Sequence, residues 1–283
     1  MGMKRRGVLL ILFGSFLSAA WATQTAAADT ALLRGLLGRP VYYDTFNRPW
    51  LDPARWMGGP TCWNWQTLEC VREIGNGRLR LAVSTFGRTD SDSGSEFGGS
   101  ELGFVNPNGI DSMKADVVQS RFSGLGCSTN DTAPTSTIVK IGGFFFNTGT
   151  GSTDDDVSDE VYLWVDPSEP TTMLVANWMT RRVGMGVSTH IGSYPIGTPL
   201  TVTNAWDKAN HRFISVVRVT GEDGPGRTVV VPYSVSDTMP PAVPFKYLLT
   251  YAFSANCTSA QTFARVEAFF DNVMINVGLP PVE

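Results

Sequence analysis

Alternation of apolar and polar residues with a period of two dominates the chain after its first forty residues. In residues 78–83, Leu79, Leu81 and Val83 alternate with arginine and alanine. Such alternation is typical of a strand, since successive side chains point to opposite faces. Further stretches rich in valine, isoleucine, phenylalanine and tyrosine lie at 41–46, 113–122, 137–147, 160–165, 172–179, 199–203, 212–219, 227–233, 246–253 and 263–277. The pattern predicts about eleven strands.

The segments between these stretches are rich in glycine, proline, asparagine, aspartate and serine. A helical period occurs only briefly, at 31–37. Without crossover helices the strands must pair mainly antiparallel, and many short strands with turn-rich joints favour an all-β sandwich or barrel. We expect one domain over 41–277, with long polar loops at 87–100 and 148–159. The aspartates of the second loop lack EF-hand spacing and are expected to be solvated.

The last predicted strand changes its apolar parity. Val266 and Phe270 share one parity, whereas Val273 and Ile275 share the other. An apolar face cannot switch parity in a regular strand. We therefore expect a bulge near residues 271–272.

The N-terminus has the three parts of a secretory signal peptide: basic residues 4–6, an uncharged run at 7–21, and small residues at Ala22 and Ala28 that suit a signal peptidase. The apolar run is about 15 residues, shorter than the roughly 20 that span a bilayer. We predict a signal peptide at 1–22, with cleavage as late as residue 28. The mature chain is then secreted or periplasmic, without a membrane span.

Charge narrows the range of partners. The formal net charge is −4, and removal of the three basic leader residues takes it to −7. Nucleic-acid binding needs clustered lysine and arginine, so we expect no nucleic-acid partner. A polyanionic ligand is also disfavoured, although a local basic patch could override the total charge.

Four cysteines follow the leader: Cys62, Cys70, Cys127 and Cys257. An even number in an oxidising compartment predicts two disulfides, for which three connectivities exist. We favour Cys62–Cys70, which closes a short local loop, together with Cys127–Cys257, which joins distant segments.

Two terminal motifs resemble a known family. Residues 44–56 contain D-T-F-N followed by L-D-P-A-R-W, and residues 269–275 read F-F-D-N-V-M-I. They resemble the first and last strands of concanavalin A-like lectin and glucanase domains, and residues 109–117 resemble a further strand of such domains. The resemblance implies a two-sheet antiparallel jelly roll that binds sugars on a concave face. The family includes hydrolases, lyases, lectins and binding modules, so the fold does not settle the function.

The hydrolases of this fold carry E-x-D-x-E or E-x-D-x-x-E on one strand. The best candidate here, residues 159–166, has Tyr162 in place of the middle aspartate and Trp164 or Val165 in place of the final glutamate. Glu160 and Asp166 are about 20 Å apart along a strand, whereas paired glycosidase carboxylates lie about 5–9.5 Å apart. A catalytic partner would have to come from another strand.

The same strand is a better candidate for binding. We expect its valine and leucine side chains to face the core and Glu160, Tyr162, Trp164 and Asp166 to face outward. Aromatic faces stack on sugar rings, and carboxylates accept hydrogen bonds from hydroxyl groups. The predicted ligand-binding set is Glu160, Tyr162, Trp164, Asp116, Lys140 and Asp166. Packing of Tyr162 and Trp164 under a loop is an equally open interpretation.

Evidence for other chemistry is sparse. The resemblance makes Asp271 a candidate ligand of a structural calcium ion, since hard oxygen ligands suit calcium; a turn-capping role is the alternative. No G-x-S-x-G or P-loop motif occurs. A Ser–His–Asp triad would need His190 or His211, and nothing in the local sequence marks either residue as catalytic.

The leading hypothesis is a secreted, lectin-like protein that binds a poly- or oligosaccharide. The alternative is a polysaccharide-degrading hydrolase or lyase with residues gathered from several strands. A structural surface protein without a sugar ligand is a third hypothesis.

Overall fold

The computed structural model describes residues 41–61, 67–181 and 185–281. The predicted signal peptide lies outside these residues. Residues Val41–Glu283 form one compact unit. Within the described part every strand pairing is antiparallel, and the strands form two sheets. No helix in this part is long and apolar enough to cross a membrane.

The first sheet, here called sheet A, is built around β6 and β15, which pair along most of their length. Its strands in spatial order are β13 (Arg227–Pro232), β12 (Arg212–Val219), β11 (Leu200–Asp207), β6 (Ser112–Leu125), β15 (Phe263–Ile275), β4 (Arg78–Phe86) and β3 (Thr67–Gly75), with β1 (Val41–Asp44) also pairing with β15.

The second sheet, here called sheet B, carries the candidate site. Its strands in spatial order are β10 (Met185–Pro195), β9 (Thr172–Arg181), β8 (Asp156–Val165), β7 (Ser136–Asn147), β14 (Lys246–Ala255), β5 (Ser95–Phe104) and β2 (Trp56–Thr61). In the part of the chain that the structure describes, three short 3-10 turns lie between strands: η1 (Pro107–Gly109), η2 (Thr153–Asp155) and η3 (Lys208–Asn210).

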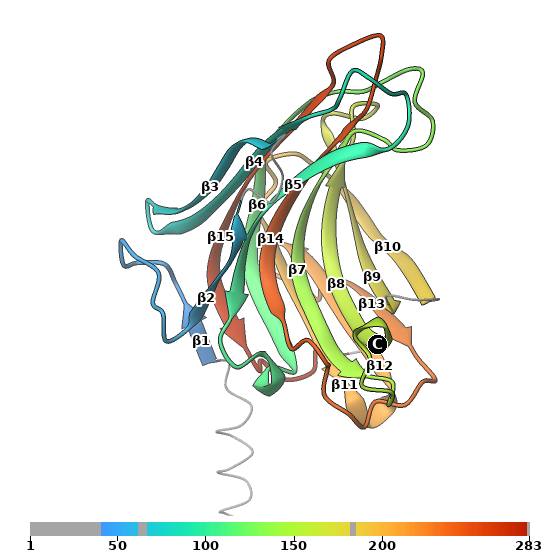
Figure 1. The fold of residues 1–283 in the computed structure, drawn as a ribbon. Coiled ribbons are helices and arrows are strands. Elements are labelled where there is room, and N and C mark those ends of the chain that lie inside the picture. Colours follow the sequence, from blue (N-terminus) through green and yellow to red (C-terminus); the bar gives the residue numbers. More distant parts are fainter. Residues whose placement is uncertain (1–40, 62–66, 182–184, 282–283) are drawn as a thin grey trace, which may run out of the picture. The chain divides into compact units, whose positions relative to one another are not determined.

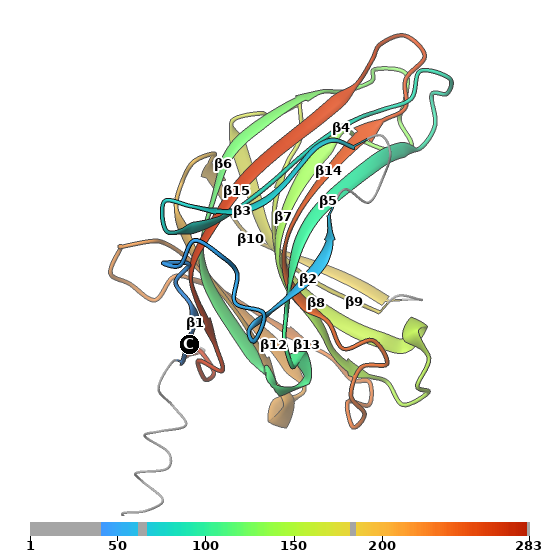
Figure 2. The same ribbon diagram turned by 60° about the vertical axis from the view of Figure 1, so that its left-hand side comes forward.

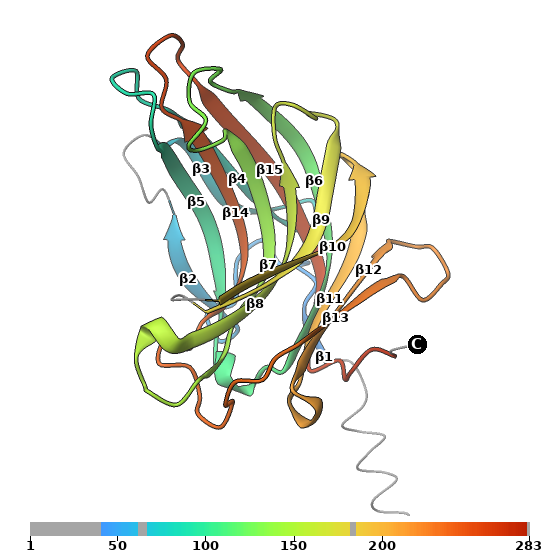
Figure 3. The same ribbon diagram turned by 90° about the vertical axis from the view of Figure 1, so that its right-hand side faces the viewer.

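The two sheets lie face to face. Figure 1 shows β14, β7 and β8 in front of β15 and β6, and the two layers separate in the turned views of Figures 2 and 3. The all-β, two-sheet antiparallel sandwich predicted from the sequence is therefore confirmed.

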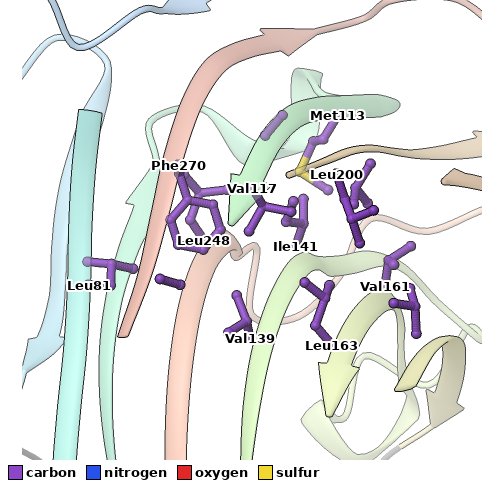
Figure 4. Close-up of a cluster of buried hydrophobic side chains, with 14 of the residues drawn as sticks. Leu81, Met113, Val117, Val139, Ile141, Val161, Leu163, Leu200, Leu248 and Phe270 are labelled. Atoms are coloured by element: carbon purple, nitrogen blue, oxygen red, sulfur yellow. The ribbon is translucent and has the colours of Figure 1, made fainter. Parts of the chain in front are cut away.

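The apolar face of each strand meets the other sheet in one core. Val161, Leu163 and Val165 of β8 are buried there, as the alternation of this strand predicted. Figure 4 shows the side chains of both sheets meeting: Leu81, Met113, Val117, Leu200 and Phe270 from sheet A, and Val139, Ile141, Val161, Leu163 and Leu248 from sheet B. Burying an aliphatic side chain of this size contributes about 1.5–3 kcal/mol, so this core is the main source of stability.

All eleven predicted strands are present, and within the described residues four further strands occur that the sequence did not predict: β2, β3, β5 and β10. The expected loop at 87–100 is wrong in its second half, because β5 begins at Ser95. The glycines of β5 do not follow the apolar alternation that predicts a strand. A Cβ atom at Gly98 would lie 2.4 Å from the Thr67 hydroxyl oxygen, so the close approach of β5 to its neighbours requires glycine there.

The expected loop at 148–159 is also too long, because β8 begins at Asp156. Asp156 is buried and accepts hydrogen bonds from the backbone N–H groups of Ala242 and Val243 at 2.7 and 2.9 Å. Asp159 is buried between the sheets. The prediction of a wholly solvated acidic loop was therefore wrong for these two aspartates.

The expected bulge in the last strand is confirmed. The pairing of β15 with β6 shifts register between Asp271 and Met274, and Asn272 adopts a left-handed conformation with φ of 49°. Phe270 before the bulge and Val273 after it are both buried. The extra residue thus keeps both apolar sets on the core side.

A disulfide joins Cys127, after β6, to Cys257, after β14, as predicted. The loops around it are also cross-linked by Asn130, whose side-chain amide donates to the backbone oxygens of Gly94 and Asn256. These loops lie at one end of the two sheets (Figure 1). Cys62 lies outside the described residues, so the Cys62–Cys70 pairing stays a prediction.

Candidate functional site

The outer face of sheet B, which points away from sheet A, carries aromatic and charged side chains in register. One row crosses the sheet through Glu101, Leu249, Lys140, Tyr162 and, at the far edge, His190. The next row contains Tyr247, Gly142, Glu160, Trp178 and Ser188, and a third contains Tyr251, Ile138, Trp164 and Leu174. Because alternate residues share a face, one sheet surface gathers residues that are far apart in sequence.

A hollow of about 530 Å³ opens on the β7–β10 half of this face. It is lined by Ile138, Tyr162, Trp164, Leu174, Ala176, Trp178, Ser188 and His190. The Tyr162 hydroxyl lies 2.7 Å from the Ser188 hydroxyl, and the Tyr162 and Trp178 rings meet edge to face at 6.3 Å. Its volume and its mixture of aromatic rings with a few hydroxyl and imidazole groups are typical of small-molecule sites.

Beside the hollow lies a buried ion pair. The Lys140 ammonium is 2.6 Å from the Glu160 carboxylate, and both side chains are at least nine-tenths buried. The Tyr247 hydroxyl donates a hydrogen bond to the other carboxylate oxygen of Glu160. The ammonium also lies 5.0 Å from the centre of the Trp178 ring and 5.8 Å from that of Tyr251. The charged pair is thus held among aromatic rings.

Gly142 explains how Glu160 reaches across the sheet. A Cβ atom at position 142 would lie 2.9 Å from Cγ of Glu160 and 2.4 Å from the backbone oxygen of Asp159. The missing side chain leaves the space through which the Glu160 carboxylate extends over β7 toward Tyr247 on β14. Burial raises the pKa of Tyr247 well above its usual range, and the negative charge of Glu160 raises it further. Tyr247 therefore stays a hydrogen-bond donor.

Glu101 on β5 is a second carboxyl group on the same face. It is only 4% exposed, and no hydrogen bond to its carboxyl group is formed within the described residues. Burial raises its pKa from 4.5 to about 7, against a smaller lowering by the Arg72 charge. The pKa of Tyr251 is raised by burial first and then by the charges of Glu101 and Glu160. Both carboxyl groups therefore lie close to the tyrosines of β14.

A second aromatic group lies on the β5–β14 half of the face. The rings of Tyr251 and Phe253 are 5.7 Å apart, and those of Phe253 and Phe97 are 6.1 Å apart. Phe97 is 42% exposed. Aromatic side chains thus lie on both sides of the polar centre formed by Glu101, Lys140 and Glu160.

The structure brings together four of the six residues predicted to bind a ligand: Lys140, Glu160, Tyr162 and Trp164. Asp116 lies on β6 in the other sheet, where it accepts hydrogen bonds from Thr201 and Asn272. Its assignment to this face was therefore wrong, because alternation within a strand does not say which sheet the strand joins.

Asp166 is also separated from the face. It lies one residue after the end of β8 and accepts hydrogen bonds from the backbone N–H and the hydroxyl group of Ser168. It caps a turn, and the strand whose alternation would have turned it outward has already ended.

Sequence reasoning missed five residues of the face: Glu101, Trp178, His190, Tyr247 and Tyr251. Trp178 and the two tyrosines occupy outward positions of strands that were predicted, so knowledge of strand order would have found them. Glu101 on the glycine-rich strand β5 and His190 on β10 were missed because neither strand was predicted.

Asp271, the residue predicted to bind calcium, lies at the bulge of β15. Asp271 lies opposite Asp116 across the β15–β6 pairing and accepts a hydrogen bond from the Asn272 backbone N–H. Both carboxylate oxygens of Asp116 already accept hydrogen bonds, as do both of Asp44. The hydrogen bond from the Asn272 backbone N–H is the contact expected for the turn-capping role. A carboxylate oxygen that accepts one hydrogen bond keeps a lone pair for a hard cation, so calcium binding at Asp271 stays a prediction.

Among the described residues, one group of three metal-ligating atoms lies close together: Asp92, Cys127 and Cys257. The two sulfur atoms are joined in the disulfide, so this group reflects a covalent cross-link and no metal centre.

No family model and no curated protein matches this chain. Among solved structures it is similar to a β-glucanase of Bacillus licheniformis, with 15% identity over 83% of this chain and 98% of the other, and a TM-score of 0.40. An alginate lyase has 13% identity over 84% and 95% of the two chains, with a TM-score of 0.41. A pseudo β-1,3-glucanase of Mycobacterium tuberculosis, described as an immunostimulatory antigen, has 13% identity over 83% and 99%, with a TM-score of 0.42. The likeness concerns the fold alone.

Proposed function

We propose that this chain binds a poly- or oligosaccharide on the outer face of sheet B. The observation that carries the proposal is the hollow of about 530 Å³ lined by Tyr162, Trp164 and Trp178. Sugar rings present flat C–H faces that stack on aromatic rings, and their hydroxyl groups pair with polar groups at the edges. Ser188 and His190 supply such groups, and both are exposed.

The charge of the face favours a neutral glycan. Lys140 is the ammonium group beside the hollow, and Glu160 neutralises it. Glu101 adds another carboxyl group on the same face. A polyuronate would bring further negative charge to carboxylates that are already buried, which costs free energy.

The test is binding to an array of neutral polysaccharides and their oligosaccharides, measured by affinity electrophoresis and calorimetry. Trp164→Ala together with Trp178→Ala is expected to weaken binding at least tenfold, because stacking on aromatic rings is lost. Trp50→Ala is the matched control: Trp50 is 64% exposed and lies between β1 and β2. Unchanged binding in the double variant would contradict the proposal.

Export by the predicted signal peptide is part of the same proposal, because it would deliver the chain to extracellular or periplasmic glycans. N-terminal sequencing of the mature protein is expected to start at Thr23 or Asp29. A protein isolated from its natural source that still begins at Met1 would contradict cleavage of a signal peptide.

A further inference from the structure

The short side chain of Ala176 on β9 is the reason that the outer face of sheet B is hollow between β8 and β10. Ala176 pairs with Tyr162 of β8 on one side and with His190 of β10 on the other. The residues two positions away on the same face of β9 are Leu174 and Trp178, which are much larger. Ala176 is buried and lines the hollow of about 530 Å³. Large side chains on four sides thus surround a space that a larger residue at position 176 would fill.

The floor of the hollow is aliphatic, whereas hydroxyl and imidazole groups lie at its rim. Ile138, Leu174 and Ala176 carry no polar side-chain atom and are buried or half-buried. Ser188 and His190 are exposed and belong to β10, the edge strand of the sheet. A group that enters the hollow therefore meets apolar carbon atoms at the floor and hydrogen-bonding groups at the β10 rim.

An unsubstituted sugar ring does not match this floor. Its hydroxyl groups would lose water against the aliphatic carbons without gaining a hydrogen-bond partner, which costs free energy. Tyr162, Trp164 and Trp178 provide the surface on which the ring itself stacks. An apolar substituent on that ring matches the aliphatic floor, because burying apolar surface is favourable.

The charges around the hollow favour a neutral substituent. Among the described residues that line it, Tyr162 and His190 are ionisable, and none is a lysine or an arginine. Lys140 beside the hollow is already paired with Glu160 at 2.6 Å. A carboxylate, phosphate or sulfate group would therefore meet no unpaired lysine or arginine there, and the Glu160 carboxylate would repel it.

We infer that the hollow receives the acetyl group of an acetylated sugar unit. The methyl group packs on Ala176 and Leu174, and the carbonyl oxygen accepts a hydrogen bond from the β10 rim. The Ser188 hydroxyl is placed for this role, because the Tyr162 hydroxyl 2.7 Å away can donate to it and leave the Ser188 proton for the ligand. The inference rests on the proposed function, since the aromatic rings hold the sugar that carries the acetyl group. An acetyl ester and an acetamide present the same methyl and carbonyl groups, so both are tested.

The first measurement needs no variant. Calorimetry on the full mature chain compares two matched pairs of neutral ligands: acetylated xylo-oligosaccharides before and after mild alkaline removal of their acetyl esters, and chitotetraose with cellotetraose, which lacks the acetamido groups. We expect the acetylated member of at least one pair to bind at least tenfold more tightly, because burial of the methyl group and a hydrogen bond to the carbonyl oxygen are added to the stacking of the ring. A preference in the first pair identifies an ester, and a preference in the second identifies an acetamide.

Ala176→Leu fills the hollow and leaves the core unchanged, because residue 176 is on the outer face of the sheet. The preference for the acetylated ligand should fall below twofold, while the affinity for the ligand without acetyl groups changes less than threefold. Thr180→Leu is the matched control, since Thr180 lies on the same face of β9 and outside the lining of the hollow; it should keep the preference. Urea unfolding checks that both variants are folded, and if Ala176→Leu is not, the comparison of ligands on the unmodified chain decides.

The possible outcomes separate this inference from the proposed function. Equal affinity for the two members of both pairs, or a preference that survives Ala176→Leu, overturns the acetyl assignment and leaves glycan binding intact. Absence of binding to every neutral glycan, acetylated or not, overturns both. Tighter binding of O-methylated than of acetylated xylo-oligosaccharides would assign the hollow to an ether methyl group and contradict the role of the β10 rim.

Discussion

Asp159 and Glu160 are neighbours on β8, and both are buried, with 0% and 4% exposure. They face opposite sides of sheet B. Asp159 points between the sheets, where both of its carboxyl oxygens lie about 3 Å from the side-chain nitrogen of Asn177. Glu160 points outward to Lys140 and Tyr247.

The difference between these residues lies in access. Burial raises the pKa of Asp159 well above its usual range, against a smaller lowering by Asn177. Its surroundings are the closed interior of the sandwich, so a perturbed carboxyl group there has no route to a ligand. Glu160 lies opposite Trp178, which lines the hollow. A buried carboxyl group marks a functional site only where the face it belongs to is open.

The largest expected effect on stability comes from removing one partner of the buried Lys140–Glu160 ion pair. Lys140→Met leaves the Glu160 carboxylate buried without its counter-charge, which costs about 3–5 kcal/mol of the free energy of unfolding. Urea unfolding at pH 7 measures the loss. The double variant Lys140→Met with Glu160→Gln should recover at least half of it, since no unpaired charge remains. A loss below 1 kcal/mol in the single variant would show that Glu160 is well solvated.

The two faces of β8 should separate stability from binding. Leu163→Ala removes a core side chain and is expected to lower the free energy of unfolding by about 3 kcal/mol. Trp164→Ala, on the outer face one residue later, should cost less than about 1 kcal/mol and weaken glycan binding at least tenfold. Thermal or urea unfolding and calorimetry measure both quantities. Equal losses of stability would contradict the assignment of the two faces.

Glu101 should make stability depend on pH. Its pKa is about 7 in the folded chain against 4.5 for an exposed glutamate. Below about pH 4.5 both states are protonated and nothing is lost. As pH rises toward 7 the unfolded glutamate ionises first, so the stability of the folded chain falls, by up to about 3 kcal/mol. Glu101→Gln removes this loss and should be the more stable chain at pH 8, with no difference at pH 4.

Asp159 offers the matched comparison for that measurement. The pKa of Asp159 is raised, like that of Glu101, so ionisation of Asp159 also lowers the stability of the folded chain as pH rises above 3.8. Asp159→Asn should remove this part of the pH dependence. Binding of an oligosaccharide should change the pH response that Glu101 produces and leave that of Asp159 unaltered, because only Glu101 lies on the open face. An equal effect of the ligand on both would remove the distinction between them.

The sequence predicts those features of the structure that depend on a local pattern of residues. Alternation on β8 correctly placed Val161 and Leu163 inward and Tyr162 and Trp164 outward, and the parity change located the bulge near Asp271. Strand order is a non-local property. It decides that Glu101, Lys140 and Glu160 share a face and that Asp116 does not, and no period along the chain contains this information.

The missed strand β5 has a physical reason of its own. Glycine is depleted in strands because it packs poorly and loses more conformational entropy, so residues 95–100, which include Gly98 and Gly99, were assigned to the loop expected at 87–100. In the structure, the Tyr251 ring occupies the space a Cβ atom at Gly99 would need, at 2.7 Å. The glycines that made β5 difficult to predict therefore also leave room for an aromatic ring on this face of the sheet.

The central claim is that a glycan contacts the aromatic face of β8 and β9. Proton–nitrogen NMR spectra of the tryptophan indole groups, recorded during titration with the oligosaccharide that binds best, test it most directly. The indole signals of Trp164 and Trp178 should shift in proportion to occupancy, whereas those of Trp50 and of the buried Trp56 should stay in place. Saturable binding that leaves Trp164 and Trp178 unshifted would contradict the account.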